Sequence, residues 1–63
     1  MHARVIARLR MELGIAAVYR DAGLRAIALE TYRNAAAALR QQHTDDVWPL
    51  YEEALMQIDA LER

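Results

Sequence analysis

The side chains that could perform chemistry in this 63-residue chain are mainly arginines and carboxylates, with two histidines. The chain has no Ser and no Cys, which removes two common nucleophiles. His2 and His43 are too few for a structural zinc site without cysteine ligands. Glu52 and Glu53 are adjacent, so on a helix they would point about 100° apart and could not converge on one group. We therefore expect no catalytic residues, no metal site and no cofactor, and we expect that the protein is not an enzyme.

The charges are unevenly distributed along the chain. Residues 1–42 contain seven arginines and three acids, a net charge of +4, whereas residues 43–63 contain one arginine and six acids, a net charge of −5. Either the acidic last third packs beside the basic part, which we favour, or a basic face is available to an acidic partner. Nucleic acid is a disfavoured partner, because the arginines are spread over two helices and the last third of the chain contains six acids.

The length of the chain bounds its organisation to one domain. A chain of this size buries only about 60% of the surface that its unfolded form exposes, and small folds commonly depend on disulfides, a metal or oligomerisation. Because the composition argues against the first two, we expect a homo-oligomer; the alternative is that well-packed long helices suffice. No apolar run approaches the roughly 20 residues of a membrane helix, so we expect no membrane span and a cytoplasmic protein.

Thirteen alanines and eight arginines favour helices, and the apolar spacing predicts a first helix over about residues 2–22. One of its apolar stripes consists of Ile6, Leu9, Leu13, Ala16 and Ala17, and a second, neighbouring stripe of Met11, Ile15, Val18, Tyr19 and Ala22. A helix that is apolar over so much of its circumference should contact more than one neighbour. Gly23 should end it, because glycine readily adopts the left-handed conformation of helix C-caps.

Two further helices are expected, over about residues 24–41 and 47–61. The second helix should pack through Leu24, Ile27, Ala28, Thr31, Ala35, Ala38 and Leu39, with Tyr32 and Ala36 beside this face. The third should pack through Val47, Leu50, Tyr51, Ala54, Ile58 and Leu61. Residues 41–46 between them form a polar loop. Pro49 limits the start of the third helix to about Val47, because proline fits only the first turn, and it disfavours a helical backbone at Trp48.

Apolar, small and aromatic residues across residues 9–42 occupy positions that suit two closely packed antiparallel helices. The positions that carry this pattern are Ile15, Ala16, Tyr19, Gly23, Ala28, Tyr32 and Ala35. The pattern resembles a tetratricopeptide repeat (TPR), a helix-turn-helix unit of about 34 residues. It departs from that family at Glu12, Ala16 and Arg40, where the family prefers Trp, Gly and Pro. The predicted fold is all-α: one domain over residues 1–63, with an antiparallel TPR-like helical hairpin plus a third packing helix. That helix is either a cap or the first helix of a second repeat.

The resemblance implies a concave face on the first helix that would bind peptides. This face would present Arg10, Leu13, Ala17 and Arg20. Two arginines would suit an acidic peptide, although we favour the alternative that they are solvated surface residues. Trp48 either closes the core beside the loop, which we favour, or anchors a partner. We predict a self-associating protein–protein interaction module, acting as an adaptor, chaperone-like partner or assembly subunit. The alternative is a helical regulator that binds nucleic acid.

Overall fold

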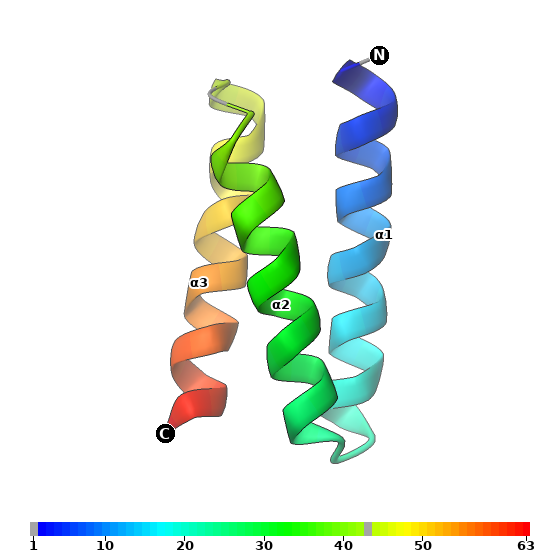
Figure 1. The fold of residues 1–63 in the computed structure, drawn as a ribbon, viewed down its shortest axis with the longest axis vertical. Helices are drawn as coiled ribbons and strands as arrows, with labels where there is room; N and C mark the ends of the chain where they lie inside the picture. Colours follow the sequence, from blue (N-terminus) through cyan, green and yellow to red (C-terminus); the bar gives the residue numbers. More distant parts are fainter. Residues whose placement is uncertain (1, 43) are drawn as a thin grey trace.

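The computed structural model describes residues 2–42 and 44–63, which form three α-helices and one 3-10 turn. The helices are α1 (His2–Asp21), α2 (Arg25–Arg40) and α3 (Trp48–Glu62), and the turn η1 (Asp45–Val47) precedes α3. Helix α2 lies in the middle, antiparallel to both neighbours, and packs against each of them (Figure 1). The described residues contain no strand. The all-α prediction of a helical hairpin with a third packing helix is therefore confirmed.

The hairpin turns at Gly23, which is where the sequence predicts the end of the first helix. Gly23 has a φ of 79°, a left-handed conformation that side chains with a Cβ rarely adopt. Its N–H donates to the carbonyl of Arg20 at 3.1 Å, and the N–H of Leu24 donates to the carbonyl of Tyr19 at 2.9 Å. This pair of bonds is a Schellman motif, which satisfies two of the last carbonyls of α1. The chain then enters α2 directly.

Small residues are among the most completely buried side chains of the core. Ala16 on α1 and both Ala28 and Ala35 on α2 have no exposed surface at all. Among the larger side chains, Tyr32 and Leu39 are the bulkiest that are fully buried. The remaining members of the core are Ile6, Leu9, Leu13, Ala36, Val47 and Ala54. The first apolar stripe predicted for α1 is in the core except for Ala17, which is only partly buried. Tyr32 and Ala36 lie inside the core rather than beside it.

Helix α3 is joined to α2 by charge as well as by apolar packing. Arg33 on α2 forms an ion pair with Glu62 near the end of α3. The Nε of Arg25 donates to the carbonyl of Leu61 in the last turn of α3, where helix carbonyls lack partners within the helix. These contacts agree with the interpretation that the acidic last third packs beside the basic part of the chain.

The entry into α3 differs from the prediction. Trp48 is helical, with φ −57° and ψ −47°, so the predicted bias of this residue away from a helical backbone is not observed. The N–H of Trp48 donates to the carbonyl of Asp45, and this bond continues η1 into α3 despite the steric cost before proline. Pro49 does lie in the first turn, as predicted. The predicted loop at residues 41–46 is partly replaced by η1, and His43 lies outside the described residues.

Several apolar residues predicted to be covered are exposed. On α1, Met11, Ile15 and Val18 are 60%, 42% and 66% exposed, and only Tyr19 of that stripe packs against the core. Each exposed member lies two residues after a core residue, about 200° around the helix, so the two stripes are opposite rather than neighbouring. Leu24, in the hairpin turn, and Ile27, in the first turn of α2, are also about half exposed.

Candidate interaction surfaces

The residues predicted to bind a partner do not form one surface. Arg10 is exposed, Ala17 and Arg20 are partly buried, and Leu13 belongs to the core. Arg10 and Arg20 are ten residues apart on one helix, about 15 Å along its axis. Trp48 begins α3 at the opposite end of the helices from Arg20 (Figure 1). The structure therefore separates this set, and Leu13 is covered by the packing of α1 on α2.

Arg20 has a structural role between the two helices of the hairpin. Its Nη1 donates to the Tyr32 hydroxyl at 3.3 Å, and its Nε donates to Oδ1 of Asp21 at 2.9 Å. The hydrogen bond to Asp21 raises the pKa of Arg20, so this side chain stays charged. Burial raises the pKa of the Tyr32 phenol, while the charge of Arg20 acts in the opposite direction. Arg20 consequently offers less of its donor fork to a ligand than the sequence suggests.

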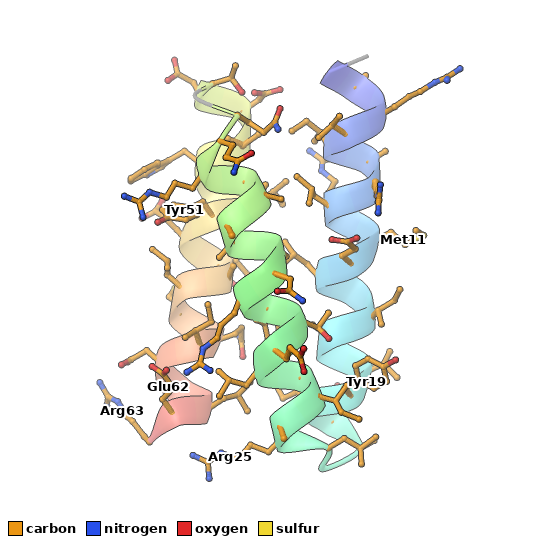
Figure 2. The ribbon with its side chains drawn as sticks, viewed as in Figure 1. Met11, Tyr19, Arg25, Tyr51, Glu62 and Arg63 are labelled. Atoms are coloured by element: carbon orange, nitrogen blue, oxygen red, sulfur yellow. The ribbon has the colours of Figure 1, made fainter. Side chains whose placement is uncertain are left out.

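The clearest exposed apolar feature is a strip along α1 that consists of Met11, Ile15 and Val18, called here the outer strip. The spacing of four and three residues places the three side chains on one face of the helix. This face is opposite the core, and Figure 2 shows Met11 pointing away from α2. A strip of large apolar side chains in this arrangement is typical of helix–helix contact.

Small and charged residues border the outer strip. Ala7 and Gly14 are exposed beside it, and a Cβ added at Gly14 would meet no atom within 4 Å. Arg8 lies towards the N-terminal end of α1 and Asp21 at its C-terminal end, with side chains 75% and 71% exposed. Arg8 also forms an ion pair with Glu12 at 3.4 Å. Sequence reasoning identified the apolar stripe but missed Gly14, whose position in the middle of a helix was the available signal.

Helix α3 also exposes apolar side chains, but in a different arrangement. Leu55 is 43% exposed and Met56 is 66% exposed. Because the two residues are adjacent, their side chains point about 100° apart and do not form a strip along the helix. Met56 therefore makes a useful comparison for Met11, since the same residue type is similarly exposed in a different context.

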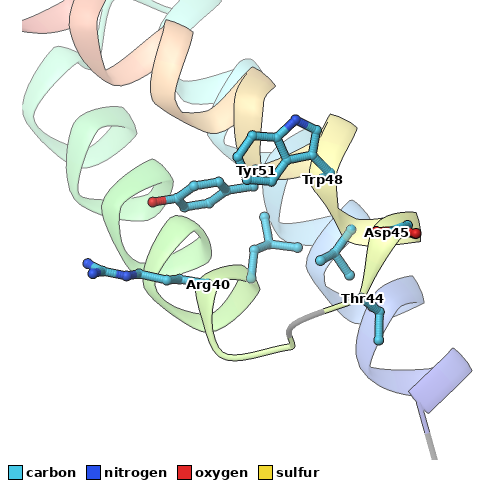
Figure 3. A pocket seen from close by; sticks show the side chains of 7 residues that line it. Arg40, Thr44, Asp45, Trp48 and Tyr51 are labelled. Carbon is cyan, nitrogen blue, oxygen red and sulfur yellow. The ribbon is translucent and has the colours of Figure 1, made fainter.

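A hollow of about 390 Å³ lies where α2 ends and α3 begins. Leu39 and Val47 line it, with Trp48 and Tyr51 on one side and Arg40 opposite (Figure 3). The two aromatic rings have centroids 5.8 Å apart and planes inclined at 47°. Trp48 is 57% exposed, so the expectation that it closes the core is wrong. On α3, Tyr51 is turned partly towards the core, and Trp48 lies at the rim of the hollow.

The described part of the chain holds no group of three or more His, Cys, Asp or Glu side chains arranged to bind a metal ion. None of the helices in residues 2–42 and 44–63 combines the length and apolar character needed to cross a membrane. Comparison with protein-family models, with curated proteins and with solved structures gave no match.

Proposed function

We propose that this chain is a small protein–protein interaction module that self-associates and serves as an adaptor, a chaperone-like partner or an assembly subunit. The observation that carries the proposal is the outer strip, where Met11, Ile15 and Val18 are 60%, 42% and 66% exposed on the side of α1 that faces away from the core. Covering these side chains would remove apolar surface from water, which is the main driving force of protein association. A chain of this size buries only a small core when it folds, so covering further apolar surface would add to its stability.

The TPR resemblance supports the same proposal. In repeat proteins each unit contacts its neighbours, and the faces at the two ends of the array must be capped or covered. We propose that α1 and α2 form one such unit, that α3 covers one side of it, and that the outer strip is the uncovered side. An adjoining protein surface would then occupy the place that the next helix takes in a longer array.

The alternative of nucleic-acid binding has less support. Arg8, Arg20 and Arg33 each form an ion pair with an acidic residue, which reduces the positive potential that a phosphate backbone requires. The acidic-peptide groove expected at Arg10 and Arg20 also has less support, since Arg20 is hydrogen bonded to Tyr32. We therefore place the interaction surface on the outer strip.

Light scattering across a concentration series tests this proposal with a matched pair of variants. The chain has a mass of 7.2 kDa, so self-association should give a larger mass that increases with concentration. Met11→Glu places a charge in the outer strip and should keep the protein at 7.2 kDa. Met56→Glu makes the same change at a similarly exposed site on α3 and should behave like the unmodified chain. Circular dichroism verifies that both variants remain helical.

Two results would contradict the proposal. If the unmodified chain stays at 7.2 kDa at every concentration, it does not self-associate. If Met56→Glu disrupts assembly and Met11→Glu does not, the interface lies on α3 and the outer strip has another role.

A further inference from the structure

We infer that the outer strip pairs with the outer strip of a second copy of this chain, with the two α1 helices antiparallel about a two-fold axis between Gly14 and Ile15. The inference rests on the proposed self-association and specifies its partner and geometry. It is supported by three independent features of α1: the symmetry of its apolar spacing, the placement of its charges, and the open space at Gly14.

The outer strip is self-complementary when the helices run in opposite directions. Met11 and Val18 are equally far from the midpoint between Gly14 and Ile15, so Met11 of each copy would lie opposite Val18 of the other. The alternating spacing of three and four residues is the pattern of a coiled-coil seam, in which each side chain inserts among four residues of the facing helix. Symmetric pairing through one shared patch is the commonest arrangement of homodimers.

The charges that border the outer strip favour the antiparallel orientation. Arg8 and Asp21 are also equally far from the same midpoint, so each copy would place Arg8 beside Asp21 of the other. Within one copy Arg8 pairs with Glu12 and Asp21 with Arg20, but both side chains are more than 70% exposed and have room for a second partner. A parallel pair would instead place Arg8 beside Arg8 and Asp21 beside Asp21, which is unfavourable. The charge pattern thus distinguishes the two orientations, whereas the apolar spacing alone does not.

Gly14 supplies the third feature. It lies within α1 with no φ in the left-handed region, and a Cβ added there would meet no atom within 4 Å, so nothing inside the chain requires glycine. Glycine nevertheless lowers the stability of a helix interior relative to alanine. In the antiparallel pair, Ile15 of the second copy would lie directly over Gly14, and the missing side chain would leave room for it.

Disulfide cross-linking tests the orientation, because the natural chain has no cysteine. Ala7 and Ala22 are both exposed and are equally far from the two-fold axis. A mixture of Ala7→Cys and Ala22→Cys chains should give mostly mixed disulfides on mild oxidation, with little product from either chain alone. Ala37→Cys, at an exposed position on α2, measures the background from random collision. Disulfide formation requires Cα atoms within about 7 Å, so the readout is specific.

A charge exchange provides a second, independent readout. Arg8→Glu and Asp21→Arg should each raise the dimer Kd by about tenfold, and the two changes in one chain should restore most of the affinity. The inference would be overturned if the double variant dimerised no more tightly than the single variant with the higher Kd. So would cross-linking of Ala7→Cys with itself, which indicates parallel helices. Either result would leave self-association intact, whereas a natural chain that is monomeric in light scattering would refute the proposed function as well.

Discussion

Gly14 and Gly23 are the only glycines in the chain, and an alanine at each should have opposite effects on stability. A Cβ at either position would meet no atom within 4 Å, so steric contacts with the rest of the protein do not enter the comparison. The two sites differ in backbone conformation. Gly14 is inside α1, whereas Gly23 has a φ of 79° and ends the hairpin turn. The sign of each effect is therefore set by the backbone alone.

The magnitudes follow from this difference. Gly14→Ala should raise the free energy of unfolding by about 1 kcal/mol, the difference in helix propensity between the two residues. Gly23→Ala forces a left-handed conformation that costs an L-residue about 1–2 kcal/mol, offset by about 0.4–1 kcal/mol from the stiffer unfolded chain. The net loss is about 1 kcal/mol. In a domain of this size the two variants should therefore melt roughly 8–16 °C apart.

Thermal and urea unfolding, followed by circular dichroism, measure both changes. Self-association would add a concentration-dependent stabilisation, so the glycine variants should be made in the Met11→Glu background at a concentration where light scattering gives a monomer. The same Gly14→Ala change in the unmodified chain should gain less, because the added methyl would press on Ile15 of the second copy. If both alanines shift the midpoint in the same direction, the backbone assignment of the hairpin is incorrect.

Three further predictions concern the core, the Tyr32 hydroxyl and the contact between α2 and α3. Leu39→Ala should lower the free energy of unfolding by about 2–5 kcal/mol, because Leu39 is 1% exposed. Leu55→Ala, at a 43% exposed site, should lower it by about 1 kcal/mol or less. Urea unfolding measures both changes, and equal losses would contradict the assignment of Leu39 to the core. Burial raises the pKa of Tyr32, so its contribution to stability is complete below the unfolded value of about 10 and is lost as the pH rises through the higher folded pKa. Tyr32→Phe should remove this alkaline loss in melts across pH, and an unchanged pH profile would show that Tyr32 does not cause it. Arg33→Ala should lower the free energy of unfolding by no more than about 1 kcal/mol, and by less in high salt, because Arg33 and Glu62 are both about half exposed. If the loss does not depend on salt in urea unfolding, Arg33 acts through packing and not through its charge.

The local features of the fold could be predicted because each depends on neighbouring residues. The three helices follow from helix propensity. The turn at Gly23 follows from glycine's access to positive φ, and the position of Pro49 in a first turn follows from proline's missing N–H. Trp48 is the exception. The 3-10 turn at Asp45–Val47 forms before it and carries the chain into α3, and neither pattern nor propensity indicated that turn.

The candidate surface could be predicted only in part. Periodicity showed that α1 has two apolar stripes, but both satisfy the same spacing rule, and Ile15 is no less apolar than Leu13. One neighbouring helix can cover only one side of α1. Which side it covers depends on how the buried residues of α1 and α2 fit together, a relationship between residues distant in the chain. The sequence by itself determined the three helices, the turn at Gly23 and the two apolar stripes of α1, and only the tertiary structure decided which face of α1 is left for a partner.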